Sequence, residues 1–145
     1  MRLCLGIVVA VFLICSAPVV AEQYSYQPSD LAPADEYFGR FQLSVLGVSN
    51  TLRDAAIHLQ LGDDPQPIVD GALASAADAI RAWERTYPRD PWIRRDLLLL
   101  VRDYVLAQTD ESHARAVATE SWLVQDYPNC VEARDAESAL YIGLK

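Results

Sequence analysis

Residues 90–107 read DPWIRRDLLLLVRDYVLA, and this stretch decides the fold. Asp90 has a side chain suited to capping a helix, and Pro91 suits the first helical position, where a backbone N–H would have no partner. The apolar run 97–101 also suits a buried β-strand, but its charged flanks show no two-residue alternation, so a helix over 91–107 is favoured. Because this helix is apolar almost all round, we expect it to lie at the centre of the fold, enclosed by others.

Two helices are predicted before the central one. Apolar residues spaced by three and four predict helices over residues 34–61 and 67–87. Gly62 suits the position just after a helix, and Pro65 cannot continue one. In the second of these helices Trp83 falls on the apolar stripe, so we expect it in the core.

Two more helices are predicted after the central one, which makes the fold class all-α with about five helices. The helix over 109–127 opens with acids at its positive end, and the helix over 129–144 opens at Asn129, with Glu132 as part of a capping box. No stretch has the composition of a linker, so residues 34–145 are expected to form one domain. The inward stripe of the 109–127 helix is predicted to hold Ala114, Val117, Ala118, Ser121, Trp122 and Gln125.

The first 21 residues, MRLCLGIVVAVFLICSAPVVA, have the pattern of a secretory signal peptide. One basic residue precedes a short apolar run, Pro18 breaks the run, and Ala21 offers a small residue before the cut. An uncleaved membrane anchor is the alternative, although a spanning helix needs about 20 apolar residues. Residues 22–33 carry two prolines and no period, so a flexible arm is predicted there. We therefore expect a periplasmic or secreted protein. Lys145 is the single lysine beside 11 arginines, a usage typical of GC-rich bacterial coding sequences.

Charge and composition exclude several functional classes. The chain has 20 acidic and 12 basic residues, a net charge of −8, so nucleic acid is not an expected partner, and a membrane is expected only if the leader is retained. Two histidines are too few for a histidine-rich metal site, and the pairs of acids lie at helix boundaries, where capping explains them. No phosphate-binding glycine loop and no nucleophile motif is present. We expect no cofactor, no metal and no enzymatic activity.

An internal repeat points to stacked helical hairpins. Tyr87-Pro88 and Tyr127-Pro128 lie 40 residues apart, and each pair closes an alanine-rich helix that carries a tryptophan. The central helix places Leu97, Leu100, Val101 and Tyr104 at the spacing W-x2-L-G-x2-Y of tetratricopeptide (TPR) repeats, and Ala76, Ile80 and Pro88 fit the second helix of that repeat.

The chain thus resembles tetratricopeptide-type repeats, especially the long repeats of the outer-membrane assembly lipoprotein family. It departs from the pattern at Val101, where glycine is usual, and at Asn50, where tyrosine is usual. The resemblance implies two antiparallel helical hairpins and a terminal helix, stacked as a short solenoid that binds a protein or peptide. An alanine-rich helical bundle is the alternative.

The resemblance also implies a binding groove along the first helix of each hairpin. Carried onto this sequence, the groove holds Arg95, Leu98, Arg102 and Val105 in the third helix, and Phe41, Ser44, Val48 and Leu52 in the first. Two arginines in an apolar groove suit a peptide with carboxylates. The alternative is that these residues pack one helix against the next. Trp83, Trp92 and Trp122 are expected to be core residues rather than a stacking platform, and Cys130 a half-buried residue rather than a reactive thiol.

We therefore expect an exported protein-binding scaffold of the bacterial cell envelope. The alternatives are an accessory or regulatory subunit of an envelope enzyme, and a membrane-tethered structural protein.

Overall fold

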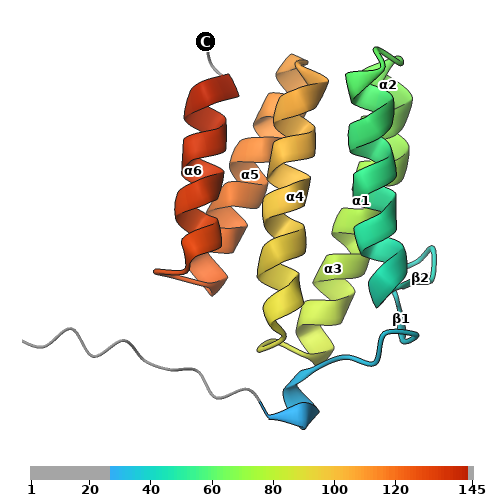
Figure 1. Ribbon diagram of the computed structural model, residues 1–145, viewed down its shortest axis with the longest axis vertical. Coiled ribbons are helices and arrows are strands. Elements are labelled where there is room, and N and C mark those ends of the chain that lie inside the picture. The colour runs from blue at the N-terminus through green and yellow to red at the C-terminus, as the bar shows by residue number, and fades with distance from the viewer. Residues whose placement is uncertain (1–26, 144–145) are drawn as a thin grey trace, which may run out of the picture.

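A computed structural model describes residues 27–143, which are mostly helical (Figure 1). The leader predicted over residues 1–21 lies outside the described residues. The elements are η1 (Pro28–Asp30), β1 (Tyr37–Phe38), β2 (Leu43–Ser44), α1 (Val45–Gln60), α2 (Pro65–Pro67), the π-helical segment η2 (Ile68–Leu73), α3 (Ala74–Thr86), α4 (Pro91–Ala107), α5 (Asp110–Asp126) and α6 (Val131–Gly143).

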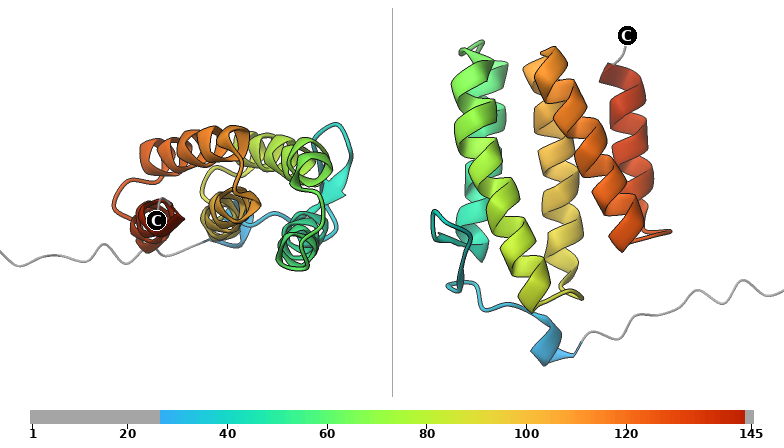
Figure 2. Two further views of the ribbon diagram at one scale, coloured as in Figure 1. Left: turned by 90° about the horizontal axis from the view of Figure 1, so that it is seen from above. Right: turned by 180° about the vertical axis from the view of Figure 1, so that it is seen from behind.

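The helices form two layers. Seen from above, α1, α4 and α6 lie in one layer, and α3 and α5 cover it on one side (Figure 2). Helix α4 occupies the middle of its layer and contacts α1, α3, α5 and α6. The expected central position of the 91–107 helix is confirmed, and its bounds match those of α4.

The first predicted helix is wrong over residues 34–44. These residues hold the antiparallel pair β1–β2, and α1 begins only at Val45. The spacing of Tyr37, Phe38 and Phe41 imitates a helix, but Gly39 has φ +70°, outside the helical range. A Cβ at position 39 would lie 2.9 Å from backbone atoms of Ala79, so only glycine fits this close approach.

The buried Phe38 ring attaches the β1–β2 hairpin to α3. Phe38 is buried and stacks on Trp83, with 5.9 Å between ring centroids. Ser44 then caps α1 by accepting a hydrogen bond from the Gly47 N–H at 2.9 Å. Packing against α3 therefore determines where α1 begins.

The other helix boundaries lie close to the predicted ones, apart from the start of α6. The π-helical segment η2 was not predicted, because no feature of the sequence indicates it. Asn129 does not cap α6, because its φ is +67°. Cys130 directly precedes the helix instead, and its Sγ accepts a hydrogen bond from the Ala133 N–H at 3.3 Å. The capping box predicted with Glu132 is therefore wrong by one residue.

The two Tyr-Pro pairs produce nearly the same helix end. Tyr87 follows α3 with φ −129° and ψ 65°, and Tyr127 follows α5 with φ −129° and ψ 59°. Each tyrosine donates its backbone N–H to a carbonyl four residues earlier, that of Trp83 or Leu123. The repeated Tyr-Pro pair in the sequence thus corresponds to a repeated backbone conformation at the ends of α3 and α5.

The predicted core position of Trp83 is confirmed, because its side chain has no exposed surface. The stripe predicted for α5 is wrong in part, because Ala114, Val117 and Ala118 are exposed. The buried face of α5 holds Ser112, Ala116, Thr119, Trp122 and Leu123. Its two hydroxyl groups donate to backbone carbonyls of α5 or its cap, which permits their burial.

The folded domain begins earlier than the predicted boundary at residue 34. The Ala32 N–H donates to Oδ2 of Asp90 at 2.9 Å, and Ala32 packs against the core. The described end of the predicted flexible arm is therefore attached to the domain.

Candidate functional site

The candidate site is the side of α4 that points away from α3 and α5, which we call the outer face. Trp92, Arg95, Leu99, Arg102 and Leu106 alternate in steps of three and four, so they form one stripe along α4. Arg95 and Arg102 are exposed, Leu99 and Leu106 are half-buried, and Trp92 is 46% exposed. The stripe combines an aromatic ring, two cations and two apolar side chains.

The start of α4 fixes the first of these side chains. Oδ1 of Asp90 accepts a hydrogen bond from the Trp92 N–H at 3.0 Å, and Pro91 occupies the first helical position. One turn later the Arg95 guanidinium lies over the Trp92 ring, 4.7 Å from its centroid. This cation–π contact holds Arg95 without neutralising its charge.

The neighbouring helices extend the outer face on both sides. On α1 the side chains of Leu46, Arg53 and Ile57 are exposed, and on α6 those of Asp135 and Ile142 are exposed. Arg102 is paired loosely with Asp135, with 3.8 Å between Nη2 and Oδ2 and both side chains about half exposed. The face is thus apolar and arginine-bearing in a chain whose net charge is −8.

The groove residues predicted from the sequence separate into three groups. Arg95 and Arg102 lie together on the outer face. Val48 and Leu98 are buried in the core, as is Leu52, and Ser44 is the cap of α1. For the buried residues, the alternative given above is therefore correct: they pack one helix against the next.

The last two predicted residues lie on other surfaces. Val105 packs against α6, where a Cβ on Gly143 would come within 2.3 Å of its Cγ1. Phe41 is exposed, with the Arg40 guanidinium 5.7 Å from its ring centroid. It belongs to the segment that joins β1 to β2, and this segment lies on the far side of α1 from α4 (Figure 1). The structure does not bring Phe41 to the outer face.

Trp92 is the residue that sequence reasoning missed. Trp83 and Trp122 are buried as expected, whereas Trp92 is exposed. The available signal was its place in the first turn after Pro91, three residues before an arginine. That spacing puts Trp92 on the arginine side of α4 rather than the leucine side.

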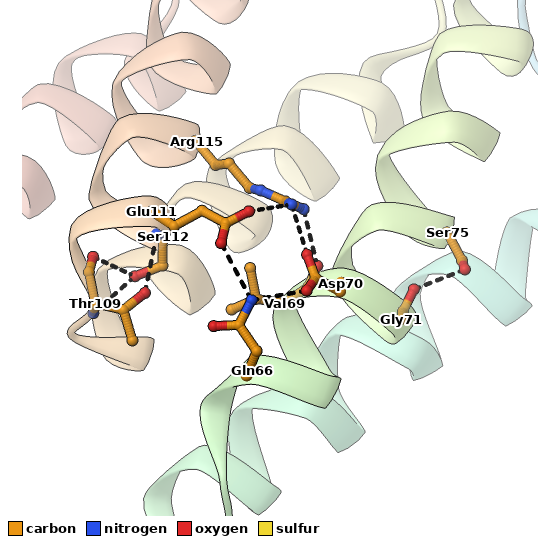
Figure 3. A network of polar contacts seen from close by, with 9 residues as sticks. All are labelled: Gln66, Val69, Asp70, Gly71, Ser75, Thr109, Glu111, Ser112 and Arg115. Carbon is orange, nitrogen blue, oxygen red and sulfur yellow. Dashed lines mark hydrogen bonds and ion pairs between the residues drawn. The ribbon is translucent and has the colours of Figure 1, made fainter.

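A second polar cluster joins the two halves of the structure (Figure 3). Arg115 of α5 donates to Asp70 at 2.6 Å, to Glu111 at 2.5 Å and to the Val69 carbonyl at 3.1 Å. Gln66 bridges the same two carboxylates, and its hydrogen bond and that of Arg115 lower the pKa of Glu111. Every charged member has a partner, so we interpret this cluster as a structural connection between η2 and α5 rather than as a binding site.

The described residues offer no site for metal chemistry. Between residues 27 and 143, no three side chains of His, Cys, Asp or Glu gather to hold a metal ion. Asp63 lies 2.6 Å from His58, and Asp64 accepts a hydrogen bond from the Gln66 N–H at the start of α2, which agrees with a boundary role for both acids. Cys130 is half-buried as expected, and burial raises the pKa of its thiol, which disfavours the reactive thiolate.

Comparison with protein-family models, with curated proteins and with solved structures gave no match to this chain. Among residues 27–143 no helix is both long and apolar enough to cross a bilayer.

Proposed function

We propose that this protein is an exported helical-repeat scaffold of the bacterial cell envelope, and that it binds a protein or peptide on the outer face. The observation that carries the proposal is the exposed Trp92 ring, with the Arg95 guanidinium over it, at the start of α4, the middle helix of the α1–α4–α6 layer. Tryptophan and arginine are enriched among the residues that dominate binding energy in protein interfaces. A partner segment with carboxylates and apolar side chains complements this surface.

The helical-repeat part of the proposal is supported by the two layers and by the matching Tyr87 and Tyr127 helix ends. In a TPR-like solenoid α1, α4 and α6 are the first helices of successive hairpins, and the outer face is the groove. Export is supported by the sequence pattern of residues 1–21.

The test is affinity capture from periplasmic extract followed by an affinity measurement with the purified partner. Wild-type protein should retain a partner that the Arg95→Ala/Arg102→Ala variant releases. Arg85→Ala/Arg89→Ala is the matched control, because both arginines are exposed but lie outside α1, α4 and α6. Equal affinity of both double variants would reject the outer face as the binding surface. A partner that proves to be an enzyme would instead favour the alternative of an accessory subunit.

A further inference from the structure

Two buried carboxylates of α4 face α1. Asp96 has no exposed surface and Asp103 is 4% exposed. The Ser49 hydroxyl of α1 lies 3.0 and 2.9 Å from the two carboxylate oxygens of Asp96. Asp103 follows seven residues later, two turns along the same side of α4. Both carboxyl groups therefore belong to the contact between α1 and α4, where the first hairpin meets the rest of the fold.

Asp103 lacks the partner that Asp96 has. Helices α1 and α4 run in the same direction (Figure 1), so the residue seven positions after Ser49, Ala56, lies at the level of Asp103. Alanine offers no donor, and Oδ2 of Asp103 is buried without a hydrogen-bond partner among the described residues. Burial of the ionised form without a donor is unfavourable, so this carboxyl group is favoured either as the neutral, protonated acid or in contact with water.

The charged groups around the two carboxyls do not compensate for their burial. Desolvation raises the pKa of Asp96 to about 6, although Ser49, Arg95 and Arg53 act to lower it and Asp90 adds to the rise. Burial alone raises the pKa of Asp103 to about 7. The buried residues of η2, α3 and α5 are uncharged, so the second layer contributes no ionised group to this contact.

Several other titratable groups on the helices around α4 have partners elsewhere. These pairs are His58 with Asp63 on the α1 side, Asp70 and Glu111 with Arg115, Asp78 with Arg40, Glu84 with Trp122, and Asp135 with Arg102.

We propose that the contact between α1 and α4 is a proton-responsive joint. With Asp96 and Asp103 protonated, the two helices pack as in the structure. Loss of the Asp103 proton favours a state in which α1 moves away and water reaches the carboxylate, because no donor of the protein satisfies it. Arg53 and Arg95 border this contact on the outer face, so opening of the joint changes that surface.

Hydrogen exchange tests the joint directly. Between about pH 5 and about pH 8 the protection factors of α1 and α4 amides should fall by about tenfold or more, since one pKa unit corresponds to a factor of ten. Amides of α6 should change less, because α4 lies between α1 and α6 in their layer (Figure 2). Asp103→Asn removes this ionisable group at nearly the same volume and should abolish the part of the change that Asp103 causes, which leaves only the contribution of Asp96.

His58→Gln is the matched control, because it removes an exposed ionisable side chain of α1 that is paired with Asp63, away from the contact between α1 and α4. It should leave the pH dependence of α1 protection intact. If Asp103→Asn does not fold, an NMR titration of the Asp103 side-chain carboxyl in the unchanged chain decides the matter. Titration of Asp103 near its ordinary range, or protection in α1 that is equal at both pH values, would overturn the proposal.

Discussion

The indole N–H of Trp83 donates a hydrogen bond to Oδ2 of Asp90 across 3.1 Å, and this contact joins the end of α3 to the start of α4. The same oxygen accepts the Ala32 N–H, and Oδ1 accepts the Trp92 N–H. Asp90 is 1% exposed. One carboxylate therefore connects the N-terminal segment, the core tryptophan and the first turn of the central helix.

Replacement of Trp83 by alanine should destabilise the protein by about 3–5 kcal/mol. The ring is fully buried and stacks on Phe38, so its removal leaves a cavity and takes away one of the two hydrogen bonds that Oδ2 of Asp90 accepts. Urea unfolding followed by circular dichroism measures the loss. Trp92→Ala is the control and should cost less than about 1 kcal/mol because Trp92 is half exposed. Equal midpoints for the two variants would contradict the assignment of Trp83 to the core.

Replacement of Asp90 by alanine should cost more than the loss of a helix cap. An N-cap substitution alone costs about 0.5–2 kcal/mol, and an unsatisfied buried donor adds about 1–3 kcal/mol. Thr109→Ala, which removes the cap of α5, supplies the comparison. Thermal and urea melts of both variants give the two values. If Asp90→Ala costs no more than Thr109→Ala, the contacts to Ala32 and Trp83 contribute nothing measurable.

The stability of the wild type should fall as pH rises from about 4 to about 7 and then level off. Burial raises the pKa of Asp103 from its ordinary value of 3.8 to about 7, so the folded state binds more protons than the unfolded state in this window. The difference of about three pKa units corresponds to up to about 4 kcal/mol. Asp103→Asn should flatten the profile and raise stability above pH 7. Urea midpoints across the pH range measure this, and a profile unchanged by Asp103→Asn would refute it.

Removal of both outer-face arginines should weaken partner binding without weakening the fold. Hydrogen bonds to charged groups contribute about 1.5–3 kcal/mol each, so Arg95→Ala/Arg102→Ala should reduce affinity at least about tenfold. The ion pair from Arg102 to Asp135 is half exposed and contributes less than about 1 kcal/mol. Calorimetric titration beside a thermal melt separates the two effects. A lowered melting midpoint with unchanged affinity would show that the arginines serve the fold alone.

The leader should be absent from protein isolated from its native host. Pro18 ends the apolar run and Ala21 provides the small residue at the expected cut. Intact-mass measurement should give a chain that begins at Glu22. A mass that includes residues 1–21 would instead support the membrane-tethered alternative.

Much of the helical architecture was predictable, because its signals are local. Asp90-Pro91 sets the start of α4 within a few residues of sequence, and the two Tyr-Pro pairs end α3 and α5 in the same way. The spacing of Arg95 and Arg102 likewise places both on one side of α4 whatever surrounds the helix. Caps, breakers and helical periodicity act within one turn, so they can be read without knowledge of the fold.

The sequence by itself therefore determined the all-α class, the central helix and the alignment of its two arginines. Only the tertiary structure decided which side chains are covered. Phe38 leaves the helical pattern because it packs on Trp83, and Leu98 is buried while Trp92 is exposed. Asp96 and Asp103 are both buried, and Asp96 is covered by Ser49 of α1. Burial depends on neighbours that lie 40 or more residues away in the chain, such as Ser49 opposite Asp96. Periodicity shows which residues share a face, but contacts between distant segments determine whether that face meets water or another helix.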